Sequence, residues 1–127
     1  MKVIHVKDIV GSERDVYCPH GGFISRRMLL ADDGMGFSLH HTTITSPEIQ
    51  HWHYKNHLEA CYCIAGGGNL VNLATGERHF IHEGMLYVLD NHDDHTFQTS
   101  WGCTLICIFN PPLKGDEIHK EDGSYEG

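Results

Sequence analysis

The sequence predicts an all-β fold, a small antiparallel β-barrel or jelly roll formed by a single domain over residues 1–127. Short runs of β-branched and aromatic residues are separated by Gly, Pro, Asn and Asp turns, which is typical of antiparallel sandwiches and barrels. No amphipathic helix longer than two turns and no internal repeat is apparent. A chain of this length supports one core. Residues 110–127, polar and glycine-bearing, are expected to form a short C-terminal lid or a mobile tail.

The N-terminal half contains three predicted strands. The first is a short strand over residues 3–6, followed by a polar stretch expected to be a loop with a helical turn. Residues 23–30 alternate and then become apolar, and Asp-Asp-Gly at 32–34 is a turn signal. Residues 37–45 are rich in β-branched and aromatic side chains, and Ser46-Pro47 ends this strand.

The C-terminal half contains more and shorter predicted strands. A strand over residues 59–65 is expected to end at the glycines of 66–68, and the next is followed by a hairpin turn at 74–76. The run TLICIF (104–109) lacks polar alternation, which indicates a strand covered on both faces, with a second subunit as one way to cover it. The remaining predicted strands span residues 69–73, 79–82, 85–89 and 96–99.

Charge and cysteine content restrict the possible partners and the compartment. Nine Lys and Arg against seventeen Asp and Glu give a formal net charge of −8, which argues against a nucleic-acid partner. No apolar run has the length of a membrane span, and the charged N-terminus lacks the apolar core of a signal peptide, so we expect a cytoplasmic protein without a membrane partner. The five cysteines are expected to be buried thiols rather than a disulfide framework.

The stretch QHWHYKNHLEACYCIAG (50–66) has the composition of a metal site at the edge of a strand. Its spacing resembles the cupin motifs: Glu59 precedes Gly66 by seven positions, and Gly84 is followed by His92 and His95 at the spacing of the second motif. The paired histidines of the first motif are missing in either register, so the usual triad is broken. Tyr87, a hard anionic donor when deprotonated, is the proposed replacement ligand. An ordinary strand tyrosine is the alternative.

Strand periodicity predicts which side chains share a cavity. His40 and Thr42 are two residues apart and therefore face the same side of a strand. A turn or bulge at residues 55–56 is expected to direct Tyr54, His57 and Glu59 into one cavity. The nearby His51 and His53 are expected to lie on the opposite face, outside the site.

Four segments together resemble the ectoine synthase family of the cupin superfamily: GFSLHHTTI, IQHWHYKNHLEACYCIAGGG, EGMLYVLDNHDDH and CIFNPPLKGDEIHKEDGSY. The resemblance extends from about Arg26 to the C-terminus and is weak before it. It implies a cupin-type barrel, a homodimer and a small-molecule substrate. The implied reaction is the cyclising dehydration of N4-acetyl-L-2,4-diaminobutyrate to ectoine, with one Fe(II) per subunit, zinc or another divalent ion remaining an alternative. The implied metal ligands are Glu59, Tyr87 and His95.

The same resemblance implies a substrate pocket. Within it, the chain departs from the family at two positions, with Phe23 in place of the common Trp and His40 in place of the frequent Asn. General acid and base roles fall to Tyr54, His57, Glu117 and His119, without a ranking among them. The implied substrate-binding residues are Phe23, Arg27, His40, Thr42, Tyr54, His57, Phe109, Glu117 and His119.

Three other functions remain open from the sequence. A relative of the family could cyclise or hydrolyse a different amino-acid derivative, which the departures at Phe23 and His40 leave room for. An iron-dependent cupin dioxygenase would consume oxygen with an organic substrate. A non-catalytic binding module would bind a small molecule without forming product.

Overall fold

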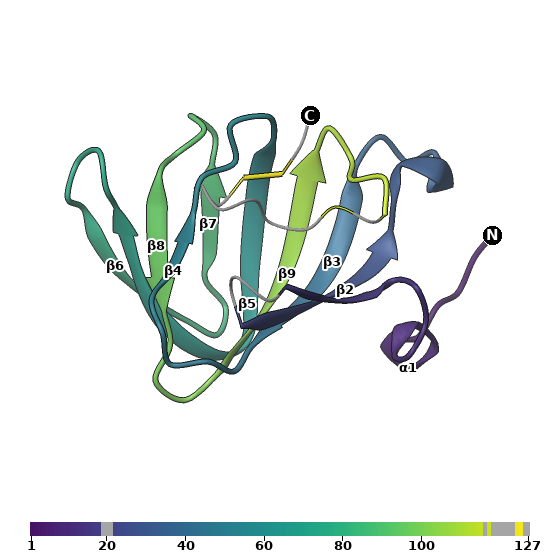
Figure 1. Cartoon of the computed structure of the whole chain (residues 1–127), viewed down its shortest axis with the longest axis horizontal. Coiled ribbons are helices and arrows are strands. Elements are labelled where there is room, and N and C mark those ends of the chain that lie inside the picture. Colours follow the sequence, from purple (N-terminus) through teal and green to yellow (C-terminus); the bar gives the residue numbers. More distant parts are fainter. Residues whose placement is uncertain (19–21, 116, 118–123, 126–127) are drawn as a thin grey trace.

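The protein is a strongly curved antiparallel β-sheet that closes into a half-barrel (Figure 1), so the predicted all-β fold class is confirmed. The computed structural model describes residues 1–18, 22–115, 117, 124 and 125. Along the sheet the strands follow the order β1-β2-β3-β9-β5-β8-β4, and β6 and β7 also pair with β5. The elements are α1 (Val6–Ile9), β1 (Asp15–Cys18), β2 (Phe23–Leu29), a 3₁₀ turn (Ala31–Asp33), β3 (Ser38–Ile44), β4 (Gln50–Trp52), β5 (Leu58–Asn72), β6 (Arg78–His82), β7 (Leu86–Leu89), β8 (His95–Gln98) and β9 (Cys103–Asn110).

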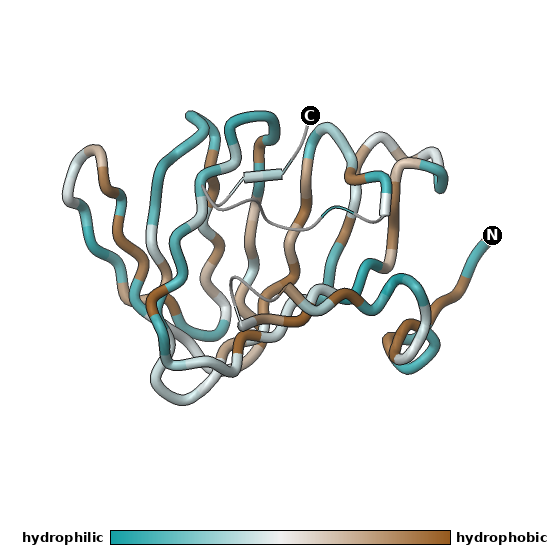
Figure 2. Tube along the Cα trace, in the orientation of Figure 1, coloured by the Kyte–Doolittle hydropathy of each residue, from teal (hydrophilic) through white to brown (hydrophobic). Residues whose placement is uncertain are grey.

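The concave side of the sheet contains the core. Burial alternates strictly along β3 and β9, as expected when one face of a strand points into a barrel. On β9 the inward side chains are Cys103, Leu105, Cys107 and Phe109, and each is less than 5% exposed. Figure 2 shows the same strand as a mostly apolar trace. The core thus lines the cavity in which a site can form.

The central element is β5, a single strand of fifteen residues. Its first half pairs with β7 and β9, and its second half pairs with β6 and β8, so it passes from one part of the sheet into the other. The predicted interruption at residues 66–68 is therefore wrong. Glycines allow the crossing because a Cβ on Gly66 would lie 2.0 Å from the Gly102 carbonyl oxygen, and one on Gly68 would lie 2.6 Å from the Phe97 ring.

Replacing Gly66 with alanine is expected to destabilise the fold by about 3 kcal/mol or more, because backbone must move to admit the methyl group. The measurement is urea unfolding of the purified variant. Gly76→Ala is the matched control, since Gly76 also has a positive φ (+77°, against +70° for Gly66) but has no neighbouring atom within 4 Å of the added Cβ. Gly76→Ala should lower the free energy of unfolding by about 1 kcal/mol, the cost of placing an alanine in the left-handed backbone region. Equal losses in both variants would contradict the close-approach explanation.

The N-terminal region differs from the prediction. Residues 3–5 form no strand, and α1 begins at Val6 because His5 caps it: His5 Nδ1 accepts from the Lys7 amide, and the Asp8 carboxylate accepts from the His5 amide. The polar stretch that follows contains β1, a strand that pairs with β2 and lacks a clear sequence pattern. The three-residue strand β4 is another strand that was not predicted.

The convex side of the sheet is apolar around β9. On this side the single chain leaves Leu58, Tyr62, Leu86, Val88 and Ile108 between 38% and 58% exposed. The run 104–109 is thus covered on its inner face only, and the predicted cover on its outer face would have to come from another molecule. Among the helices of the described residues, none has the length and apolar character needed to cross a membrane.

Candidate active site in the half-barrel

A narrow cavity opens on the concave side of the sheet, between β2, β3, β5, β7 and β9. Its free volume is about 10 Å³, roughly the space of one water molecule. Most of its wall is apolar or aromatic, with one carboxyl group, Glu59. The lining residues are Phe23, Ser25, Thr42, Trp52, Tyr54, Glu59, Cys61, Tyr87, Leu105, Cys107, Phe109 and Tyr125.

The predicted turn at residues 55–56 is present and changes the direction of the chain between β4 and β5. Tyr54 and Glu59 consequently line the cavity, and the His57 ring packs edge-on against Phe109 at 5.9 Å. His92 Nδ1 donates to the Tyr54 carbonyl at 2.8 Å and holds this turn in place. The predicted exclusion of His51 is correct: it is exposed, and its Nε2 lies 2.5 Å from Asp94.

The Glu59 carboxyl group is buried, and no cationic side chain of the described residues is among the groups that shift its pKa. Burial raises its pKa from 4.5 to about 8, against the opposing effect of hydrogen bonds from the thiols of Cys61 and Cys107. A carboxyl in this position is neutral at pH 7 unless a cation is brought in. A cation beside this carboxyl would lower its pKa and favour the carboxylate.

His95 presents a buried polar atom, Nε2, with no hydrogen-bond partner among the described residues. His95 Nδ1 lies 2.8 Å from the Asp93 carbonyl and must donate to it, which leaves Nε2 as the acceptor. Burial lowers the pKa of His95, so the ring is neutral. This tautomer is the form that ligates metals, with the backbone carbonyl orienting the ring.

Glu59, Tyr87 and His95 are the three side chains that the family resemblance implies as metal ligands, and all three are buried. They supply a carboxylate, a phenol and an imidazole, the hard and intermediate donors that suit iron. A buried imidazole nitrogen without a hydrogen-bond partner among the described residues is costly, and a bound cation would satisfy it. Tyr54 lies in the cavity wall together with Glu59 and Tyr87, and its ring is 6.2 Å from the His95 ring.

A second set of donors shares Glu59. The ligand atoms of Glu59, Cys61 and Cys107 all lie within 4.8 Å of one another, and all three residues are buried. We did not predict this thiol pair as a site, although alternation places Cys61 on the same face as Glu59, and Cys107 on the same face as Phe109. All five cysteines are free and buried, as predicted.

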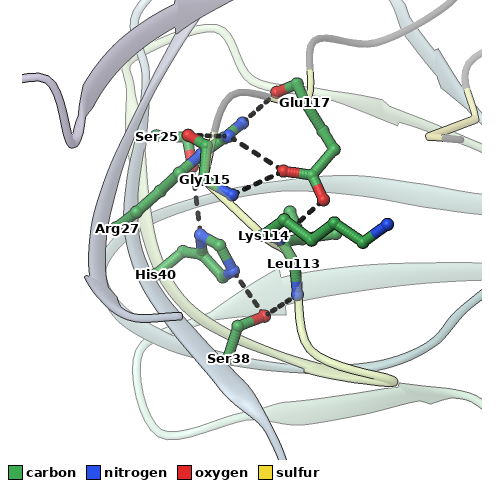
Figure 3. Close-up of polar contacts among 8 residues, drawn as sticks. All are labelled: Ser25, Arg27, Ser38, His40, Leu113, Lys114, Gly115 and Glu117. Atoms are coloured by element: carbon green, nitrogen blue, oxygen red, sulfur yellow. Dashed lines mark hydrogen bonds and ion pairs between the residues drawn. The ribbon is translucent and has the colours of Figure 1, made fainter. Parts of the chain in front are cut away.

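A buried arginine connects the sheet to the C-terminal segment (Figure 3). Arg27 is fully buried on β2 and donates to the Gly115 carbonyl at 2.7 Å and to the Glu117 carbonyl. Its guanidinium also lies 3.7 Å from the Glu117 carboxylate. The donors expected to bind a substrate carboxylate thus contact the C-terminal backbone in this structure.

Replacing Arg27 with lysine is expected to loosen this connection, because an ammonium group cannot reproduce the fork of donors. Loss of one hydrogen bond to a charged donor should cost about 2 kcal/mol locally, roughly a 30-fold rise in opening. Hydrogen exchange of the Leu113 amide, which donates to the Ser38 hydroxyl, is the measurement. Arg26→Lys is the matched control, since Arg26 pairs with Asp15 on the other side of β2. Equal exchange in both variants would contradict the role given to Arg27.

His40 belongs to the same polar network and not to the cavity wall. Its Nε2 lies 2.9 Å from the Ser38 hydroxyl, and its Nδ1 lies 3.4 Å from the Ser25 hydroxyl. Burial, followed by the nearby Arg27 charge, lowers the pKa of His40 from 6.5 to about 3. The ring is therefore neutral. At this position it acts as a hydrogen-bonding amide would.

The candidate acid and base groups differ in protonation. Burial lowers the pKa of His57, which leaves a neutral ring whose buried Nδ1 has no hydrogen-bond partner within residues 1–18, 22–115, 117, 124 and 125. Burial alone would raise the pKa of Glu117, but the amides of Lys114 and Gly115 outweigh it and lower this pKa. Burial raises the pKa of Tyr54 well above 10. His119, the fourth candidate, lies outside the described residues.

Tyr125 is a cavity residue that the sequence did not reveal. It is 2% exposed, stacks on Tyr54 at 5.4 Å and meets Phe109 edge-on at 5.6 Å. The Asn56 amide group donates to its carbonyl at 2.9 Å, and Arg27 lies 6.0 Å from its ring. Tyr125 therefore closes part of the cavity on the concave side of the half-barrel. A lone tyrosine in a polar tail carries no periodic signal, so no sequence pattern pointed to it.

Comparison with known proteins gives a consistent result. The family described as ectoine synthase matches residues 1–127. The L-ectoine synthase of Wolinella succinogenes is 49% identical over 94% of this chain and 91% of its own, and that of Alkalilimnicola ehrlichii is 50% identical over 98% and 94%. The crystal structure of ectoine synthase from P. lautus is 42% identical, with a TM-score of 0.88 over 97% of this chain and 87% of that one. A polyketide cyclase from Streptomyces resistomycificus, 19% identical with a TM-score of 0.73, shares the fold.

Proposed function

The chain belongs to the ectoine synthase family, and on this basis we propose that it converts N4-acetyl-L-2,4-diaminobutyrate into ectoine and water. The observation that carries the proposal is the cavity itself. Its wall contains a buried carboxyl, Glu59, and a buried phenol, Tyr87, and the Tyr54 ring in the same wall lies 6.2 Å from the neutral imidazole of His95, which supports the proposal. The reaction is a carbon–oxygen lyase reaction, in which the acetamide oxygen leaves with two protons as water.

We propose that Glu59, Tyr87 and His95 hold one Fe(II) per subunit. The donor set supports iron rather than a purely oxygen-ligated ion such as Mg²⁺. When bound, such an ion supplies Lewis-acid polarisation of a carbonyl oxygen and support for negative charge on it. Zinc meets the same donor types, so the choice of metal is decided by the reconstitution described below.

Side chains of the pocket would orient the substrate and transfer the protons. The α-amine must lose protons and approach the acetamide carbon, and the aromatic wall of Phe23, Phe109 and Tyr54 would fold the chain of the substrate for that approach. His57 is the preferred general base because its Nδ1 is neutral and has no hydrogen-bond partner among the residues that the structure describes. Glu117 is a weaker base because backbone amides already stabilise its charge. Tyr54 keeps its proton and is the preferred donor to the departing oxygen.

The remaining substrate-site residues have supporting roles in this proposal. Thr42 lies in the cavity wall, and Arg27 and His40 support the wall from behind through Ser25 and the C-terminal segment. His119 stays a proposed acid or base from the family resemblance. The substrate would have to displace Tyr125 or share the cavity with it, because the free volume is too small for a diaminobutyrate derivative.

The test is reconstitution of the reaction. Protein purified anaerobically is loaded with Fe(II) and incubated with N4-acetyl-L-2,4-diaminobutyrate, and ectoine is measured by chromatography. Product should form in proportion to bound iron and disappear with a chelator. Parallel loading with Zn(II) determines which ion supports turnover. Absence of product from fully iron-loaded, folded protein would overturn the proposed reaction and leave the fold unaffected.

We also propose that two copies associate through the apolar convex face of β5, β7 and β9. Tyr62 pairs in register with Leu86 on one side and Ile106 on the other, so the exposed apolar side chains form one continuous surface. Continuous apolar surfaces of this kind are typical of subunit interfaces. Tyr62→Glu should therefore yield monomers in analytical ultracentrifugation, whereas Tyr17→Glu, a change at an exposed tyrosine on β1, should not. A monomeric wild-type protein would contradict the proposal.

A cytoplasmic location is the remaining part of the proposal. All five thiols are free and buried, which suits a reducing compartment.

A further inference from the structure

The two thiols beside Glu59 are placed by the sheet, not by a flexible loop. Cys61 and Cys107 are register partners on β5 and β9, and Glu59 is two residues before Cys61 on the same face. Their ligand atoms lie within 4.8 Å of one another, and the residues are 1%, 4% and 5% exposed for Cys61, Cys107 and Glu59. A rigid, buried group with two sulfurs and one carboxylate differs in chemistry from the proposed iron ligands.

We propose that Glu59, Cys61 and Cys107 form a second metal site, selective for thiophilic cations such as Cd²⁺ and Zn²⁺, and that an ion held there excludes iron. The exclusion rests on the proposed function, because it requires Glu59 to be an iron ligand. The binding of a thiophilic ion to iron-free protein does not depend on the proposed function.

The geometry suits such ions. A tetrahedral site with metal–sulfur bonds of about 2.3 Å places its sulfurs about 3.7 Å apart, within the spread of this group. Tyr87 on β7 is the register partner of Cys61, and its buried hydroxyl interacts with the Cys61 thiol. The Tyr87 hydroxyl is therefore positioned to be the fourth ligand of the ion, as an oxygen donor. Each thiol releases its proton to solvent when the ion binds, so the step requires no oxidant or reductant.

The competition follows from ligand softness. Thiolates favour Zn²⁺ and Cd²⁺, whereas phenolate, imidazole and carboxylate suit Fe(II). Glu59 and Tyr87 would be ligands of either ion, so a thiophilic ion held by Cys61 and Cys107 would leave iron with His95 as its one unshared ligand among the three proposed. The cavity would then be occupied by an ion lacking the His95 ligand.

The probe is Cd²⁺ added to iron-free protein. We expect one ion per chain and an ultraviolet thiolate-to-Cd²⁺ charge-transfer band, both measured by titration and by metal analysis after gel filtration. Cys61→Ser and Cys107→Ser should each weaken Cd²⁺ binding by about tenfold or more and reduce the band to about half. Prior loading with Fe(II) should suppress the band.

Cys103→Ser is the matched control. Cys103 and Cys63 form another buried thiol pair, with sulfurs 3.9 Å apart, outside the set that contains Glu59. This variant should bind Cd²⁺ as the wild type does. A band lost in Cys103→Ser, or retained in full by folded Cys61→Ser and Cys107→Ser, would overturn the site. A band unaffected by bound iron would overturn the competition alone, and the reconstitution of turnover tests the reaction separately.

Discussion

Replacing His95 with alanine is expected to remove most of the bound iron and all measurable ectoine formation. The imidazole is oriented by the Asp93 carbonyl with Nε2 free, and no neighbouring described side chain hydrogen-bonds that atom. Alanine leaves two protein donors, too few to hold Fe(II) against solvent. Metal analysis and the turnover assay on the same preparation provide the measurement. His82→Ala, a change at an exposed histidine on β6, is the control and should keep iron and activity.

A conservative companion variant separates ligation from folding. Tyr87→Phe removes only the hydroxyl and keeps the ring that stacks 6.2 Å from Phe97. After oxidation to Fe(III), the wild type should show a visible phenolate-to-iron charge-transfer band that this variant lacks. Full iron occupancy in both His95→Ala and Tyr87→Phe would refute the assignment.

The fold could be predicted where burial follows a simple period. The inward and outward alternation of β3 and β9 is visible in the sequence because one face of each strand is buried. The continuity of β5 was not predicted, since glycines at 66–68 normally end a strand. Here they allow three backbones to approach closely, a tertiary requirement that local propensity does not contain. The helix α1 depends on a cap made by a histidine, an unusual capping residue.

The site could be predicted where its residues share a strand face. Spacing and family resemblance led to Glu59, Tyr87 and His95, and the turn at residues 55–56 followed from the break in phase between Tyr54 and His57. The role of Tyr125 depends on the path of the C-terminal segment, which no periodicity encodes. For Arg27 and His40 the family resemblance implied substrate contacts, which stay a prediction. Their contacts to the Gly115 carbonyl and to the Ser38 hydroxyl were not predicted, because they depend on tertiary packing.

Replacing Glu59 with glutamine should stabilise the iron-free protein at high pH while it destroys the site. The Glu59 pKa is about 8 in the folded chain and 4.5 in the reference state, because burial disfavours the carboxylate. A raised acid pKa means that the native state binds the proton more tightly than the unfolded state. The resulting stability is present in full below pH 4.5 and is lost as pH rises through 8. The loss is about 1.4 kcal/mol per pH unit within this window.

Glutamine remains neutral at every pH, so the stability of Glu59→Gln does not fall with rising pH through this group. Urea unfolding of iron-free protein at pH 5 and pH 9 should show a gain for Glu59→Gln over wild type that is a few kcal/mol larger at pH 9. Glu48→Gln, at an exposed position, should track the wild type at both pH values. Added Fe(II) should reverse the order at pH 9, because only the wild type offers the ion a carboxylate there. A gain that is equal at the two pH values would show that Glu59 is solvated in the native state and would remove the electrostatic argument for a cation site.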